Sequence, residues 1–179
     1  MFRKMMSCAA LATSMVAFAQ QGNHWVVAKG SYTEFDSHFP VGDKEGFGLG
    51  YGTWCTDHFG FDLTLLHTDL KPRLGSPLAS SNQNQFLASF LFTFNPGGEH
   101  FLPYLAVGAG GTQIGKAYSD SHQQTIRANY HAGVGAQFKL GERFAITLDS
   151  KYVRTQTDPV RNDWVNTVGF GVVWGKDVL

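Results

Sequence analysis

Apolar side chains recur at every second position along much of the chain, and this alternation predicts β-strands. It is clearest in residues 59–65, 86–94, 130–138 and 144–148, where large apolar residues alternate with smaller or polar ones. Successive side chains of a strand point to opposite faces, so each run has one apolar face and one face of mostly small or polar residues. After residue 20, no run reaches 18 consecutive apolar residues or keeps a helical period, which excludes a helical membrane protein.

Four weaker segments bring the number of predicted strands to eight. They are residues 24–33, 46–55, 101–113 and 164–174, in which glycine often takes the place of the polar residue. The phase of the first of these segments is ambiguous. We assign its side chains to two faces, with Val26, Ala28 and Tyr32 on one and Lys29 and Ser31 on the other.

The connections between the eight segments alternate between long and short. The long ones are residues 35–45, 70–83, 115–124 and 155–163, and the short turns lie at Thr56-Asp57, Asn95–Gly98 and Gly141-Glu142. Outer-membrane barrels show this alternation, with long loops outside the cell and short turns in the periplasm. We therefore expect an all-β fold, a closed eight-stranded antiparallel up-and-down transmembrane β-barrel with both ends on the periplasmic side.

Residue size decides which face of such a barrel meets lipid. An eight-stranded barrel has an interior just wide enough for side chains to fill it. The phenylalanine-rich face would overfill that space, whereas the face of glycine, serine and threonine fits inside. The aromatic face is therefore expected to lie against lipid, which is the reverse of a soluble barrel.

Charged residues sort in the same way. Five of them fall on the small face and are candidates for ion pairs in the lumen: Lys29, Asp62, Lys139, Asp149 and Lys151. A charge on the lipid side at mid-bilayer would cost roughly 2–4 kcal/mol, and a buried charge needs a partner. At least one Asp–Lys contact is therefore expected inside the barrel, and Asp149 and Lys151, which share a face, are suitable members.

Aromatic residues at the strand ends predict two girdles at the membrane interfaces, because amphipathic rings prefer the headgroup layer. Those near the periplasmic rim are Trp25, Trp54, Phe94, Phe101, Tyr104, Phe144 and Trp174, and those near the outer rim are Tyr32, Tyr152 and Trp164. Alternatively, some of these rings are ordinary strand aromatics.

The first 19 residues predict a signal peptide. Arg3 and Lys4 give a positive start, an apolar stretch follows, and Ala17–Ala19 is a small-x-small cleavage signal. The exported barrel domain would then span residues 20–179; the alternative is a retained anchor helix, for which the apolar stretch is short. Cys55 is the one cysteine of the predicted mature chain, so the fold does not rely on an internal disulfide.

Four glycine-rich stretches carry a resemblance to a known family: residues 48–63, 103–110, 132–135 and 168–174. They resemble the small outer-membrane β-barrels of the OmpA-transmembrane-domain and OmpX kind, and the resemblance covers the whole predicted mature chain. Such barrels usually end on an aromatic residue that the assembly machinery recognises. Here Trp174 is followed by a short tail, so either Trp174 or the terminal Leu179 would serve as that signal.

The resemblance implies a protein of the cell outer membrane that strengthens the envelope or presents loops to the outside, rather than a general pore. The implied partners are outer-membrane lipid and lipopolysaccharide, the assembly machinery, and an extracellular ligand bound through loops 35–45, 70–83, 115–124 and 155–163. The 14 basic and 14 acidic residues balance, which gives no electrostatic footprint for nucleic acid. The seven histidines lack metal-ligand spacing, and neither a metal nor a cofactor is expected.

Three alternatives stay open. We expect the inward charges to pair across the lumen and plug it; they could instead line a narrow water path. A lipid A-modifying enzyme would need a serine with a base in reach; Ser119–His122 contains the residue types, and Ser150 lies in a strand on the lipid-facing phase. A soluble, lipocalin-type barrel would need the phenylalanine-rich face inside, which the size of those side chains opposes.

Overall fold

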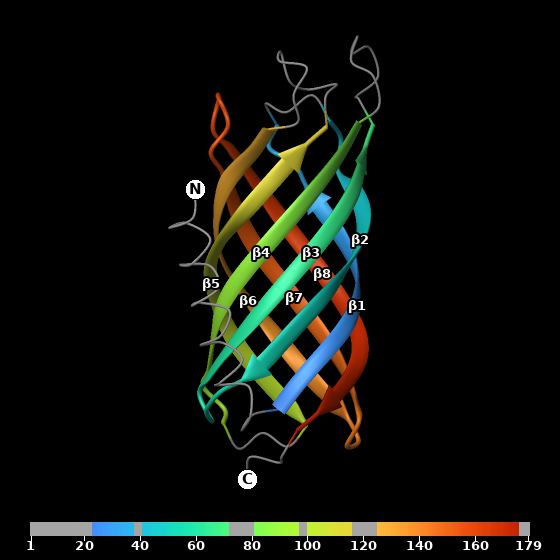
Figure 1. The fold of residues 1–179 in the computed structure, drawn as a ribbon, viewed down its shortest axis with the longest axis vertical. Coiled ribbons are helices and arrows are strands. Elements are labelled where there is room, and N and C mark those ends of the chain that lie inside the picture. The colour runs from blue at the N-terminus through green and yellow to red at the C-terminus, as the bar shows by residue number, and fades with distance from the viewer. Residues whose placement is uncertain (1–22, 38–40, 72–80, 97–99, 116–124, 176–179) are drawn as a thin grey trace, which may run out of the picture.

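Eight antiparallel β-strands close into one barrel in the computed structural model (Figure 1). The strands are β1 Asn23–Glu34, β2 Lys44–Trp54, β3 Phe59–Leu70, β4 Ser81–Thr93, β5 Phe101–Ile114, β6 Thr125–Leu140, β7 Phe144–Thr155 and β8 Arg161–Trp174. The structure describes residues 23–37, 41–71, 81–96, 100–115 and 125–175. Each strand pairs with the next in the chain, so the predicted up-and-down barrel is confirmed.

Three features of the sequence fall on residues outside these ranges. They are the predicted signal peptide of residues 1–19, the Ser119–His122 cluster and the terminal Leu179. Within the ranges that the structure describes, no helix has the length and hydropathy needed to cross a membrane.

The ring of backbone hydrogen bonds has no open edge. β1 pairs with β8 in continuous register from His24 opposite Trp174 to Glu34 opposite Trp164. In lipid, an unpaired edge would leave N–H and C=O groups without partners, at several kcal/mol each. The short connections between β2 and β3, β4 and β5, and β6 and β7 lie at the same end as the start of β1 and the end of β8, the lower end in Figure 1.

Several strands extend further toward the opposite, outer end of the barrel than the segments of alternating apolar residues predict. β4 begins at Ser81 rather than at residue 86. Outward residues in this extension, such as Asn84, are polar, so the apolar alternation stops although the backbone ladder with β3 continues. β7 and β8 are longer too, and the connection between them is residues 156–160 instead of the expected 155–163.

The outer wall of the barrel is apolar on every strand. Several of its side chains are more than half exposed, among them Phe47, Leu65, Val107, Val134 and Val168. The phase assigned to β1 is confirmed, with Val26, Ala28 and Tyr32 exposed and Lys29 and Ser31 buried. The packing is thus inside-out, and a wall of this kind is stable against lipid rather than water.

The seam between β1 and β8 leaves no room for a side chain at Gly171. A Cβ there would collide with the backbone of Val26 and Val27, whereas a Cβ on Gly30 points outward and meets nothing closer than 4.0 Å. We predict that Gly171→Ala lowers the free energy of unfolding by about 1–3 kcal/mol, because neighbouring backbone must shift. Gly30→Ala should change it by less than about 0.5 kcal/mol. Urea titration in phospholipid vesicles measures both, and equal effects would contradict the close approach.

Candidate functional site in the barrel interior

The inward side chains fill the barrel in layers of different polarity. Along β4, from the periplasmic end toward the outer end, they are Leu91, Ser89, Leu87, Gln85 and Gln83. All five are at most 2% exposed. Inward residues of the other strands join these levels, so the interior divides into a lower apolar layer, an ion cluster, an upper apolar layer and an uncharged polar band.

The lower apolar layer closes the periplasmic end. It consists of Trp25, Val27, Trp54, Leu91, Tyr104, Ala106, Ala145 and Val173, all buried. Its rings interlock: the centroids of Trp25 and Trp54 are 5.8 Å apart, and Trp54 meets Tyr104 edge-on at 6.1 Å. The indole Nε1 of Trp54 donates to Oε1 of Gln137 at 3.0 Å, so this buried N–H has a partner.

Three aromatic residues expected in the periplasmic girdle therefore lie inside the barrel. Trp25, Trp54 and Tyr104 are 3%, 6% and 7% exposed, and the prediction that they face the headgroup layer is wrong. Each ring packs on a glycine directly opposite on the next strand, Trp25 on Gly52, Trp54 on Gly60 and Tyr104 on Gly135. A glycine leaves the space that a second side chain would occupy, so a large ring fits in a narrow interior.

The other seven predicted interface aromatics point outward. They are between 39% and 65% exposed: Tyr32, Phe94, Phe101, Phe144, Tyr152, Trp164 and Trp174. Tyr152 and Trp164 pack together on β7 and β8 with ring centroids 5.4 Å apart. Their position in a headgroup layer stays a prediction.

Four of the five predicted lumen charges form one ion cluster above the lower apolar layer. Nζ of Lys29 lies 3.1 Å from Oδ2 of Asp149 and 3.5 Å from Oδ1 of Asp62. Nζ of Lys151 lies 3.4 Å from Oδ2 of Asp62 and 3.9 Å from Oδ1 of Asp149. Each lysine thus contacts both aspartates, and the four buried charges, from β1, β3 and β7, balance.

The fifth charge, Lys139, does not join this cluster. It lies on the last part of β6, opposite Ala145, and is only partly buried. Lys151 is opposite Gly133, further along β6 toward the outer end, so the two lysines occupy different levels of the barrel.

Hydroxyl groups complete the hydrogen bonding of the two carboxylates. Asp149 accepts from the Tyr104 hydroxyl at 2.7 Å and from the Thr167 hydroxyl at 3.0 Å. Asp62 accepts from the Thr64 hydroxyl at 2.7 Å. Hydrogen bonds to a charged group are stronger than those between neutral groups, so these hydroxyls fix the carboxylates in place.

Hydroxyl groups also accept hydrogen bonds from the two lysines of the ion cluster. Lys29 donates to Oγ1 of Thr64 at 2.9 Å, and Lys151 donates to Oγ of Ser89 at 3.1 Å. Because an ammonium can only donate, the Ser89 oxygen accepts from Lys151 and its own proton is available for Nε2 of His131, 2.9 Å away. The network therefore continues from the ion cluster to His131 on β6.

Above the ion cluster the interior becomes apolar again and then polar. The upper apolar layer is Leu66, Leu87, Val153 and Val165. Beyond it, the polar band contains the buried side chains of Ser31, Thr33, Gln83, Gln85, Thr112, Asn129 and Thr155. Near the outer end, Phe35, Val41 and Leu70 pack together with Ile114 against them.

Sequence reasoning missed a second buried ion pair near the outer end. Nε of Arg161 lies 2.8 Å from Oδ2 of Asp163, and Nη2 donates to Oε1 of Gln83 at 2.6 Å. The guanidinium also lies over the ring of Phe35, 5.4 Å from its centroid. Both residues fall in the predicted connection of residues 155–163, but they share the inward parity of Val165 on β8, and that parity is the signal in the sequence that indicates their place.

The two apolar layers separate the ion cluster from water on both sides. Ions in such surroundings are stable only with partners, so removing one of them leaves the others unbalanced. The ion cluster therefore acts as a fixed crosslink without net charge between β1, β3 and β7.

The described residues include one free thiol and lack a cluster of metal-binding side chains. They contain no group of three or more His, Cys, Asp or Glu side chains that could hold a metal ion. Cys55, in the turn after β2, is a free thiol and partly buried. Burial raises the pKa of this thiol, which keeps it protonated at neutral pH.

We predict that substitutions at two members of the ion cluster change the free energy of unfolding in a non-additive way. Asp149→Asn and Lys29→Met should each lower the free energy of unfolding by about 3–5 kcal/mol, because each leaves the remaining charges unbalanced. The double variant retains the neutral Lys151–Asp62 pair, so its loss should be smaller than the sum.

Urea titration in phospholipid vesicles measures these losses. Asp158→Asn, at an exposed site between β7 and β8, is the control and should change stability by less than about 0.5 kcal/mol. Additive losses of the two single variants would argue against coupling within the cluster.

The sequence matches the family described as outer membrane protein beta-barrel domain over residues 5–175. No curated protein sequence matches it. Among solved structures, the outer membrane protein OprG from Pseudomonas aeruginosa is similar with a TM-score of 0.63 and 15% identity, over 88% of this chain and 98% of OprG.

Two further solved structures have the same fold. Ail, the attachment invasion locus protein of Yersinia pestis, has a TM-score of 0.55 and 19% identity, over 87% of this chain and 100% of Ail. Neisserial surface protein A has a TM-score of 0.56 and 14% identity, over 87% of this chain and 100% of that protein. With the family match over nearly its whole length, the chain belongs to the outer membrane protein beta-barrel domain family and is a protein of the outer membrane.

Proposed function

We propose that this protein is an integral outer-membrane barrel with a structural or surface-interaction role, and that its lumen is plugged rather than open. The observation that carries the proposal is the ion cluster of Lys29, Asp62, Asp149 and Lys151, held between the two apolar layers. A solute crossing the lumen would have to separate these pairs and pass both layers. A filled interior of this kind supports an anchor more than a channel.

The layers oppose conduction for different reasons. In the lower apolar layer, Trp25, Trp54 and Tyr104 are in ring contact, so a hydrated ion would have to shed its water there. In the ion cluster, an ion of either sign meets a like charge beside each opposite one. Both barriers act in series along the same narrow path.

With the lumen filled, we assign the function to the wall and the ends of the barrel. Outer-membrane lipid and lipopolysaccharide are the proposed partners of the apolar wall. An extracellular ligand is proposed to bind through the outer connections as the strands delimit them, residues 35–43, 71–80, 115–124 and 156–160. Cleavage of the signal peptide after Ala19 and recognition of Trp174 or Leu179 by the assembly machinery belong to the same proposal.

The proposal assigns no catalytic step. Ser150, considered for a lipid A-modifying enzyme, lies on the outward phase of β7, opposite Asn166. The histidine on the neighbouring strand β6, His131, points inward and hydrogen bonds with Ser89 instead. Nucleophilic catalysis needs a base within hydrogen-bonding distance of the serine. Because Ser150 and His131 point to opposite faces of the barrel wall, their arrangement does not support His131 as the base for Ser150.

Planar-bilayer conductance tests the plugged lumen. The purified full chain is expected to give no steady channel, whereas a large porin inserted in the same way conducts. Trp54→Ala thins the lower apolar layer and should raise the frequency of brief openings several-fold. Phe144→Ala, which removes an outward ring at the same end of the barrel, should not.

Two results would go against the proposal. A steady ohmic conductance of the wild-type chain would favour the narrow-channel alternative. An equal increase from Phe144→Ala would mean that openings reflect a loosened barrel wall rather than a thinner plug.

A further inference from the structure

A groove interrupts the apolar wall on the side formed by β1 to β6. Its outward lining consists of two cross-strand rows, the first of Phe47, His67, Asn84, Gln113 and Ile126 and the second of Leu49, Leu65, Phe86 and Gly111. The volume of the groove is about 940 Å³. Ligand pockets are typically about 300–1,000 Å³, so the groove is large enough for a ligand.

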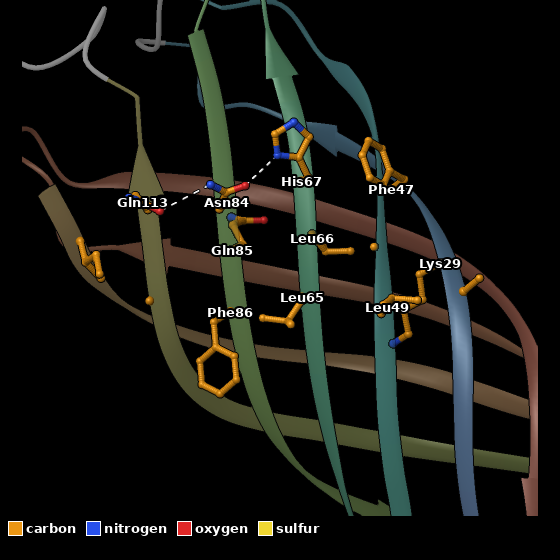
Figure 2. Close-up of a pocket in the computed structure, with 14 residues that line it drawn as sticks. Lys29, Phe47, Leu49, Leu65, Leu66, His67, Asn84, Gln85, Phe86 and Gln113 are labelled. Carbon is orange, nitrogen blue, oxygen red and sulfur yellow. Dashed lines mark hydrogen bonds between the residues drawn. The ribbon is translucent and has the colours of Figure 1, made fainter. Parts of the chain in front are cut away.

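The centre of the first row is a chain of polar side chains. Nδ1 of His67 lies 2.7 Å from Oδ1 of Asn84, and Nδ2 of Asn84 donates to Oε1 of Gln113 at 3.4 Å. Figure 2 shows the three side chains on β3, β4 and β5, with Leu65 and Phe86 beside them on the second row. These hydrogen bonds are exposed rather than buried, so the polar row remains open to a partner.

The second row provides an apolar floor with a gap. Gly111 has no side chain, and a Cβ there would lie 3.1 Å from Cγ2 of Ile126. On either side of it, Phe86 is 43% exposed and Ile126 is 71% exposed. An apolar floor next to a polar row matches an amphipathic ligand, which has an apolar part for the floor and a polar part for the row.

The three central strands of the groove, β3, β4 and β5, lack the outward aromatic residues that β1, β6, β7 and β8 carry toward their outer ends. Outward rings there are Tyr32 on β1, Tyr130 on β6, Tyr152 on β7 and Trp164 on β8. Such rings anchor a barrel in the headgroup layer. On β3, β4 and β5 the corresponding outward side chains are those of the polar row, so hydrogen-bonding groups lie where the headgroup layer is expected.

We propose that the groove binds one molecule of an outer-leaflet glycolipid. An acyl chain would lie along Leu65 and Phe86 and over Gly111, and hydroxyl or amide groups of the sugar would hydrogen bond to Asn84 and Gln113. The occupant is a lipid because the groove is continuous with the wall that faces the membrane. The inference rests on the proposed contact of the wall with outer-membrane lipid, which it narrows to one site, and does not depend on the plugged lumen.

The charges around the groove favour a sugar over a phosphate as the recognised group. The one charged residue of its lining is Lys29, whose ammonium is held by Asp149 inside the barrel. Nε2 of His67 lies 3.3 Å from the carboxylate of Asp69, which is exposed and would repel an anion. Amide groups, in contrast, match the hydroxyl and amide groups of an acylated amino sugar.

Native mass spectrometry of the full chain tests this site. The protein in detergent micelles is given equimolar lipid A, an acylated glucosamine disaccharide, and phosphatidylglycerol, and retained lipid is counted. Wild-type protein is expected to retain lipid A about fivefold or more over phosphatidylglycerol, a ratio that one or two net hydrogen bonds supply. Monophosphoryl and diphosphoryl lipid A are expected to be retained equally.

Matched variants locate the binding. Asn84→Leu removes the centre of the polar row and Gly111→Leu fills the floor, and each should lower lipid A retention about fivefold. Asn162→Leu makes the same change at an outward position at the outer end of β8 and should have no effect. Heat-modifiable migration in gels establishes that each variant is folded.

Several outcomes would overturn the proposal. Equal retention of the two lipids by the wild-type chain, or a loss of retention on removal of one phosphate, would exclude sugar recognition, and neither result requires a folded variant. An equal drop for Asn162→Leu would move the binding away from the groove. A dimer that Gly111→Leu dissociates would identify the groove as a contact between two copies of the chain.

Discussion

A closed ring of eight strands encloses a space that its own side chains only just fill, and its outside must be stable against lipid. Both requirements act on the same alternating sequence, so each strand has to place large apolar groups outward and small or polar groups inward. The outward rows of Phe, Leu and Val and the inward glycines follow from this constraint. The contents of the lumen are set by the volume that remains.

That volume is filled by two kinds of packing. Where a large ring points inward, a glycine lies opposite, as with Trp25 on Gly52, so that the summed size stays within the limit. Where charges point inward, two lysines contact two aspartates, so four ions are buried without net charge. Hydroxyl groups of Thr64 and Ser89 provide further hydrogen bonds to them. The resulting layers connect strands that are far apart in sequence and make the barrel a filled cylinder.

The sequence predicts the parts of this structure that depend on local alternation. Strand number, closure and the inward phase of the cluster charges all follow from a period of two. The pairing of Lys29 with Asp149 does not, because these residues meet only through closure of the ring. The prediction for Trp54 is wrong because it follows the position of this residue at a strand end, whereas its phase, shared with Gly50 and Gly52, points inward. Arg161 was missed because apolar alternation stops beyond the membrane, where both faces of a strand can be polar.

The central claim, that the packing is inside-out, has a direct spectroscopic test in the four tryptophans. Trp164 and Trp174 point outward, whereas Trp25 and Trp54 point inward. In vesicles whose lipids carry brominated acyl chains, a variant that keeps only the outward pair, the others replaced by phenylalanine, is predicted to lose most of its fluorescence. A variant that keeps only the inward pair should retain most of it. Strong quenching of the inward pair with little quenching of the outward pair would contradict the account.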